Sequence, residues 1–138
     1  MPWDSSACNG FTTSPQPWLE TEPLPPDLTA EAQVGRPGST WELYREMIGL
    51  RKRLPQLWSE PMEVFAHTEN TVVVFRGNVT IIANLGHAPF EFVPEGTFDV
   101  EFESHIGATG RDEGVLRVHA ESAVVISRET GPAAQRTP

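Results

Sequence analysis

One amphipathic helix with a wide apolar surface constrains most strongly what this chain can fold into. The stretch STWELYREMIGLRKRL, residues 39–54, begins at Ser39, a good N-cap residue, and Glu42 completes a capping box. Acidic residues come early in the stretch and basic residues come late, which suits the helix dipole. Pro55 ends the helix because proline has no backbone N–H and disfavours helical geometry in the preceding residue.

The apolar side chains of this helix cover roughly half of its circumference at about 100° per residue. They are Trp41, Leu43, Tyr44, Met47, Ile48, Leu50 and Leu54. A helix on one side of a small core needs a narrower stripe, about 100° or a little more. Arg51 lies within the apolar arc. Either its stem packs while its head reaches water, or the helix is held between two bodies and Arg51 pairs with a carboxylate of one.

The region after the helix, residues 62–128, has the pattern of about seven short strands. We expect them at residues 63–67, 71–76, 79–84, 90–93, 97–103, 115–119 and 122–128. Gly77-Asn78 is a two-residue hairpin signal, and residues 107–114 are expected to form a turn. The predicted fold is mainly β: an antiparallel Greek-key β-sandwich preceded by one amphipathic helix and a long Pro-rich irregular segment.

The strand at 97–103 alternates strictly between apolar and acidic residues. Phe98, Val100 and Phe102 are expected to face inward, and Asp99, Glu101 and Glu103 outward. Three carboxylates on one flat strand face do not converge on a calcium ion unaided, so a solvated acidic face is predicted. The four histidines lack metal-ligand spacing, and no phosphate-binding loop or nucleophile elbow occurs. The sequence therefore predicts no metal, no cofactor and no self-contained active site.

The Pro-rich segment, residues 1–38, holds seven of the thirteen prolines yet carries large apolar side chains. Disordered segments lack such side chains, and long irregular segments of compact domains tend to be functional. We therefore expect a loop that packs against another body. Residues 129–138 are expected to form a flexible tail.

Charge and composition limit the partners and the compartment. A formal charge of −9 argues against nucleic acid or an anionic membrane as a partner. No apolar run is long enough to span a membrane, the start has no signal-peptide pattern, and the single cysteine, Cys8, cannot form an internal disulfide. A soluble, cytoplasmic chain is expected.

The beginning of the chain resembles the α-glucosidases of glycoside hydrolase family 13, such as the oligo-1,6-glucosidases. The resemblance is carried by Met1-Pro2-Trp3-Asp4, Asn9-Gly10-Phe11-Thr12-Thr13 and Pro17-Trp18-Leu19. In that family this stretch forms the long loop after the eighth barrel strand, beside the substrate entrance. The resemblance makes five residues candidates for contacts with an α-glucoside: Trp3, Asp4, Asn9, Phe11 and Trp18. Residues 39–54 resemble the eighth barrel helix, and residues 62–128 resemble the C-terminal sandwich.

The family's catalytic acids would lie on barrel strands before Met1, and Pro2 stands where glutamine is common. Asp4 and Glu20 are acidic, but nothing in the sequence indicates that they face each other as a glycosidase pair does. The resemblance implies a C-terminal fragment of an α-glucosidase-like enzyme, structural in role and inactive alone. Its partner would be a catalytic barrel, upstream or on a separate chain. The alternative is a stand-alone β-sandwich that binds carbohydrate or protein through Trp3, Phe11 and Trp18.

Overall fold

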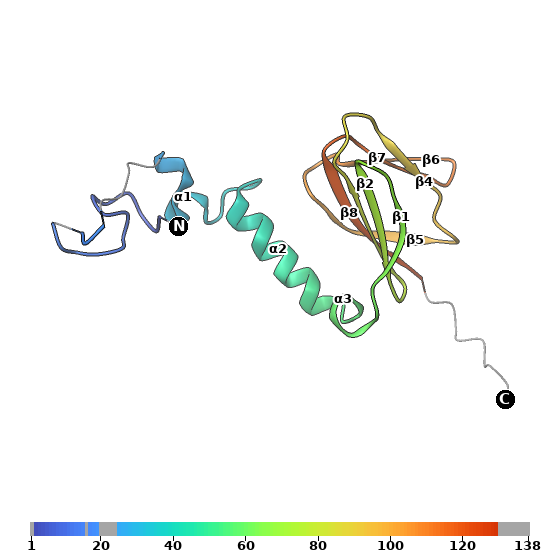
Figure 1. The fold of residues 1–138 in the computed structure, drawn as a ribbon, viewed down its shortest axis with the longest axis horizontal. Coiled ribbons are helices and arrows are strands. Elements are labelled where there is room, and N and C mark those ends of the chain that lie inside the picture. Colours follow the sequence, from blue (N-terminus) through green and yellow to red (C-terminus); the bar gives the residue numbers. More distant parts are fainter. Residues whose placement is uncertain (1, 16, 20–24, 130–138) are drawn as a thin grey trace. The chain divides into compact units, whose positions relative to one another are not determined.

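The computed structural model describes residues 2–15, 17–19 and 25–129, and the chain divides into two compact units, residues 1–48 and 49–138. Its helical elements are η1 (Pro26–Leu28), α1 (Ala30–Gln33), α2 (Thr40–Arg53) and α3 (Gln56–Ser59) (Figure 1). Its strands are β1 (Glu63–His67), β2 (Thr71–Arg76), β3 (Val79–Asn84), β4 (Phe90–Phe92), β5 (Phe98–Glu103), β6 (Thr109–Asp112), β7 (Val115–Val118) and β8 (Ser122–Arg128).

Helix α2 confirms the predicted helix, but only half of the predicted capping box forms. The Glu42 N–H donates to Ser39 Oγ at 3.3 Å, as expected of an N-cap. The Glu42 carboxylate instead accepts a hydrogen bond from the Gly35 N–H at 2.7 Å and pairs with Arg45. The reciprocal half is absent because the Ser39 N–H donates to the Arg36 carbonyl within the α1–α2 turn.

The Pro-rich segment contains two short helical elements where the sequence predicted only irregular structure. Pro26 begins η1, a position that suits its fixed φ and missing N–H. Thr29 then caps α1, its Oγ1 accepting a hydrogen bond from the Ala32 N–H at 3.2 Å. The prediction of a wholly irregular segment is therefore wrong at this point, because Pro26 begins a short helical turn.

The strands form an antiparallel β-sandwich, as predicted. One sheet has five strands in the order β1-β2-β3-β8-β5, and the other has three in the order β4-β7-β6 (Figure 1). The main core lies between the sheets and consists of fully buried side chains: Val73, Ile82, Leu116, Val118, Val124 and Ile126. A second cluster contains Leu50 of α2 with Val79 and Val125. By strand alternation these two valines lie on the opposite, outer face of the five-stranded sheet.

The hairpin predicted at Gly77-Asn78 is confirmed, since Arg76 pairs with Val79 and Gly77 has a φ of 60°. The turn predicted at residues 107–114 is wrong in part, because it contains strand β6. Thr109–Asp112 has no apolar alternation, and it is extended because it pairs with β7. The predicted turn remains on both sides of β6, at Gly107-Ala108 and at Glu113-Gly114, and Gly107, Glu113 and Gly114 have φ values of 77°, 44° and 85°.

Strand β5 does not alternate as predicted, because it carries a β-bulge. Val100 pairs with Ile126, whereas Phe102 pairs with Val125, so Glu101 is the extra residue. A bulge of one residue transfers the following side chains to the other face of the sheet. Phe98 and Val100 accordingly pack on the main core, and Phe102 packs on the outer cluster with Leu50.

A buried asparagine links the two sheets. Asn84, at the end of β3, is 2% exposed. Its Nδ2 donates to the carbonyls of Ala88, Val118 and His119 at 2.8, 3.2 and 2.8 Å. Its Oδ1 accepts a hydrogen bond from the Gly86 N–H at 3.1 Å. One side-chain amide thus joins the end of β3 to backbone groups of the β3–β4 loop and of the chain at Val118 and His119.

Candidate functional site

The candidate site is the loop of residues 3–11, which closes on itself through backbone hydrogen bonds. The Trp3 N–H donates to the Asn9 carbonyl at 2.8 Å, and the Asn9 N–H donates to the Ser6 carbonyl at 2.9 Å. The Gly10 N–H donates to Ser6 Oγ at 3.0 Å. These bonds bring three of the predicted residues, Trp3, Asp4 and Asn9, into one turn. Ser6, which the sequence did not single out, holds that turn together.

Two consecutive residues of the loop have left-handed backbone conformations, Asn9 with φ 51° and Gly10 with φ 75°. Asparagine tolerates this region better than most residues, and glycine adopts it at no steric cost. A Cβ at position 10 would lie 2.8 Å from both Asp4 Oδ2 and Trp3 Cβ. The Asn-Gly pair is therefore required by the close approach of the chain to Trp3 and Asp4.

Helix α1 anchors the loop from a distant part of the sequence. The Ala30 N–H donates to the Pro2 carbonyl and the Glu31 N–H to the Trp3 carbonyl, both at 2.9 Å. These N–H groups belong to the first turn of α1, where no carbonyl of the helix itself can accept them. The capping Thr29 is 2% exposed.

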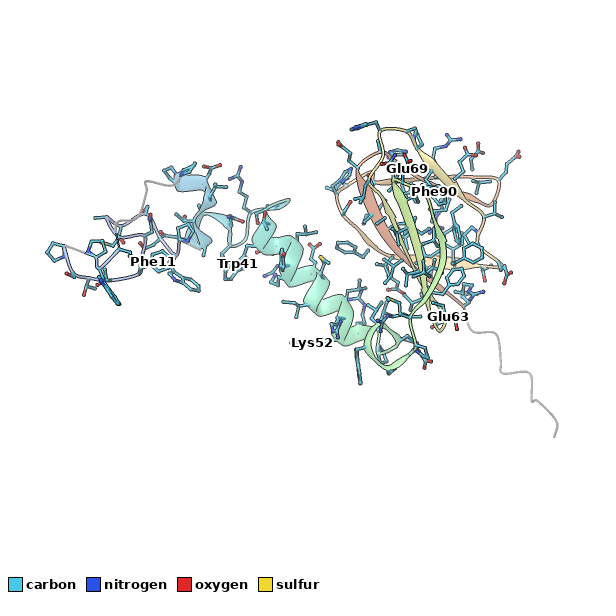
Figure 2. All side chains as sticks on the ribbon, viewed as in Figure 1. Phe11, Trp41, Lys52, Glu63, Glu69 and Phe90 are labelled. Carbon is cyan, nitrogen blue, oxygen red and sulfur yellow. The ribbon has the colours of Figure 1, made fainter. Side chains whose placement is uncertain are left out.

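The aromatic side chains of the site remain open to solvent. Trp3 and Phe11 are 51% and 52% exposed, and Trp18 is 100% exposed. The Phe11 N–H donates to the Cys8 carbonyl at 3.0 Å, which places Phe11 at the edge of the closed loop (Figure 2). Trp18 is not brought into that turn. Aromatic faces can stack on the apolar face of a sugar ring, and a carboxylate beside them can accept hydrogen bonds from the sugar hydroxyls.

The Asp4 carboxylate is held in its ionised form. The Ser6 hydroxyl, and next the Ser6 N–H, hydrogen-bond this carboxylate and lower its pKa below the ordinary value of 3.8. A carboxyl with a lowered pKa is a poor proton donor near neutral pH. Asp4 is thus suited to accept hydrogen bonds from a ligand rather than to serve as a general acid. Glu20, its possible partner in sequence, lies outside the described residues.

The acidic strand β5 is not the solvated face that the sequence predicted. Glu101 accepts a hydrogen bond from the Ser127 hydroxyl at 2.6 Å and lies 3.6 Å from Arg53 of α2. Glu103 accepts hydrogen bonds from the N–H and hydroxyl of Thr109. Only Asp99 is exposed. Within the described ranges, no three His, Cys, Asp or Glu side chains are grouped so that they could hold a metal ion.

Comparison with solved structures gives matches to enzymes that act on sugars. Isomaltulose synthase (PalI) from Klebsiella sp. LX3 matches 91% of this chain with a TM-score of 0.75 and 21% identity. Trehalulose synthase MutB from Pseudomonas mesoacidophila MX-45 matches the same share with a TM-score of 0.75 and 24% identity. The chain has the fold of one part of the alpha-amylase family enzymes. An alpha-amylase from H. orenii matches 73% of the chain with a TM-score of 0.61 and 22% identity.

This fold agrees with the resemblance in sequence to family 13. The chain spans only 22% to 24% of the length of these three enzymes. No family model matches the sequence, and no curated protein matches it. Across the described part of the chain, no helix is long and apolar enough to cross a membrane.

Proposed function

We propose that this chain is the C-terminal part of an α-glucosidase-like glycoside hydrolase, and that its role is to support the catalytic barrel. The observation that carries the proposal is the size of the structural match. It includes 91% of this chain but 24% of the synthases, so those enzymes have a large additional part that this chain lacks. The loop residues from Trp3 to Phe11 would then border the substrate entrance of that barrel.

Exposed apolar groups on α2 support a role beside another body. Tyr44 and Ile48 are 63% and 53% exposed, although tyrosine and isoleucine side chains gain stability when buried. Both belong to the wide apolar arc of the helix. We propose that the barrel covers them, and that Leu50 and Leu54, on the sandwich side, fix the end of the helix to the outer sheet face.

The DNA upstream of Met1 tests this proposal most directly. We expect an in-frame reading that encodes a barrel with the family's two catalytic aspartates and one glutamate. An in-frame stop codon there, with no barrel gene adjacent, would contradict the proposal. A barrel on a separate adjacent gene would instead indicate an interaction protein that docks on it.

The isolated chain is expected to release no glucose from maltose, isomaltose or an aryl α-glucoside. The reason is that, by the resemblance, the family's two catalytic aspartates and one glutamate lie on barrel strands outside the sequence of this chain. Turnover at ordinary enzyme rates, about 1–1,000 per second, by the pure chain would refute a purely supporting role. An Asp4→Asn variant of the same preparation distinguishes activity of the loop from a contaminating enzyme.

The alternative, a stand-alone sugar- or protein-binding sandwich, is favoured by one observation. Trp18 is fully exposed and Trp3 and Phe11 are half exposed, so all three can meet a free ligand. A soluble α-glucan that quenches the tryptophan fluorescence of the isolated chain in a saturable way would support this alternative. Loss of that quenching in Trp18→Ala would assign it to the loop.

A further inference from the structure

A hollow opens at the edge of the sandwich, outside the loop and the helix faces considered above. Its volume is about 390 Å³, within the usual range of small-molecule sites, roughly 300–1,000 Å³. Four phenyl rings line it, those of Phe65 on β1, Phe75 on β2, and Phe90 and Phe92 on β4 (Phe90 is labelled in Figure 2). The hollow therefore lies between the two sheets, where β1 and β4 are edge strands.

The strand β1 is shaped so that Phe65 reaches this hollow. The pairing of β1 with β2 shifts register between Val64 and Ala66, which makes Phe65 the bulged residue. Its ring lies 4.8 Å from that of Phe75, at an interplanar angle of 33°, yet Phe65 is 63% exposed. A large aromatic side chain thus forms a wall that is open to solvent.

Thr80 gives the hollow a polar group that lacks a partner. This residue of β3 lines the hollow and is only 2% exposed, and its hydroxyl makes no hydrogen bond to any described residue. Thr80 Oγ1 is not among the described buried side-chain atoms that lack a partner, so it is open to the hollow, where a hydroxyl can pair with water or with a bound molecule. A bound molecule that carries a hydroxyl could therefore hydrogen-bond to Thr80.

The charges around the hollow are balanced, which favours a neutral occupant. The Arg128 guanidinium lies 6.0 Å from the centre of the Phe75 ring and 3.2 Å from the Glu95 carboxylate. The other lining carboxylate, Glu91, pairs with Arg117 at 2.8 Å. An isolated cation or anion would have to compete with these pairs, whereas hydroxyl groups can bond to the free edges of an Arg–Glu pair.

We propose that this hollow binds a neutral pyranose ring, with the apolar ring faces against the phenyl groups and hydroxyls bonded to Thr80 and to the Arg128–Glu95 pair. The choice of a pyranose among neutral hydroxylated rings rests on the proposed function. The site itself does not depend on a barrel, because all of its lining residues belong to the sandwich.

The test is a titration of the isotope-labelled full chain with methyl α-glucopyranoside, maltose and isomaltose, followed by amide NMR shifts. We expect saturable shifts at the hollow-lining residues, and none with sorbitol, an open-chain polyol without ring faces. Absence of saturable shifts, or saturable shifts at the N-terminal loop alone, would overturn the proposal.

Thr80→Val supplies the decisive variant, because it keeps the shape of the side chain and removes the hydroxyl. We expect about a tenfold weaker sugar affinity, the loss of one hydrogen bond, with a melting temperature equal to or above that of the wild type. Thr71→Val is the matched control: Thr71 is 6% exposed on the neighbouring strand and does not line the hollow. Equal affinities for the wild type and Thr80→Val would refute the role of the hydroxyl.

A second variant covers the case in which Thr80→Val does not fold. Glu95 is exposed at the rim, so Glu95→Gln should fold normally and weaken sugar binding several-fold. Unchanged binding in this variant would also count against the site. If the sugar titration fails, the proposal of a sugar site is refuted, and the upstream-DNA test of the proposed function still stands. If no barrel is encoded upstream or nearby and the chain nevertheless binds sugar tightly, only the proposed function is refuted.

Discussion

The N-terminal loop and the sandwich keep their conformations by different means. Backbone hydrogen bonds and left-handed residues hold the loop, while its aromatic side chains stay exposed. The sandwich is held by apolar side chains that are fully buried between its sheets. In the loop, then, the large side chains carry little of the structure and remain available to another body. In the sandwich, exposed large apolar side chains such as Phe65 and Ile106 lie outside the core that holds the fold.

The largest expected effect is on the outer cluster of the sandwich. Leu50→Ala removes a side chain that is 4% exposed and leaves a cavity against Val79 and Val125, which should cost about 2–5 kcal/mol of unfolding free energy. Ile48→Ala, on an exposed position of the same helix, should change it by at most about 0.5 kcal/mol. Urea unfolding measures both. Equal, large losses would show that α2 is fully buried within this chain.

The next effect concerns the polar link between the sheets. Asn84→Ala removes the amide that bonds the carbonyls of Ala88, Val118 and His119, of which Val118 is buried, and this should cost about 1–3 kcal/mol. Asn78→Ala is a milder comparison, because the Asn78 amide donates to one carbonyl, that of Arg128. Thermal unfolding of the two variants should therefore give the lower midpoint for Asn84→Ala. The reverse order would mean that apolar packing alone joins the sheets.

A substitution in the loop should change the protease sensitivity of the loop and leave the stability of the sandwich unchanged. Gly10→Ala places a Cβ at a φ of 75° and 2.8 Å from atoms of Trp3 and Asp4, so it should open the loop. We expect chymotrypsin to cleave roughly tenfold faster after Trp3 or Phe11. The melting temperature of the sandwich should not change. Gly35→Ala is matched in φ, but its Cβ would meet nothing within 4 Å. It should accelerate cleavage less. A lower melting temperature of the sandwich in Gly10→Ala would contradict the independence of the two regions.

The smallest expected effect is the pH dependence of the loop. Because the pKa of Asp4 is lowered in the closed loop, ionisation of its carboxylate stabilises that loop. This stabilisation is fully present above pH 3.8. It is lost as the pH falls through the lowered pKa of the closed loop. An NMR titration of Asp4 should give a midpoint below 3.8. Ser6→Ala should move it upward, since the Ser6 hydroxyl is the main cause. A midpoint at or above 3.8 in the wild type would show that the loop is open in solution.

Elements with a strong local signal could be predicted from the sequence. Helix α2 follows from its cap, its charges and Pro55, and the hairpin at Gly77-Asn78 follows from its turn residues. Strand β6 could not be predicted, because Thr109–Asp112 is extended only through its pairing with β7. The bulge at Glu101 was missed for the same reason, since a perfect alternation in sequence does not reveal how the partner strand is aligned.

Some residues of the candidate site could likewise be predicted from the sequence, and others could not. Trp3, Asp4 and Asn9 were found through the resemblance, and their turn could have been suspected from the Asn-Gly pair. The anchoring of this turn by Ala30 and Glu31 depends on a contact between distant segments. The hollow depends on four phenylalanines from three strands and on Thr80, whose burial no sequence pattern shows.

The bulge at Glu101 also affects which changes of length strand β5 can tolerate. Because of the extra residue, one short strand supplies side chains to both sides of the sheet, Phe98 and Val100 to one and Phe102 to the other. Deleting Glu101 would restore an ordinary ladder in which Phe102 directly follows Val100 and still pairs with Val125, so the Phe102 ring would stay on the outer face beside Leu50. The loss would be the contacts of the Glu101 carboxylate with Ser127 and Arg53. Among single-residue deletions in this strand, that of Glu101 should therefore be tolerated best, because a deletion elsewhere would turn the side chains on one side of it to the other face of the sheet.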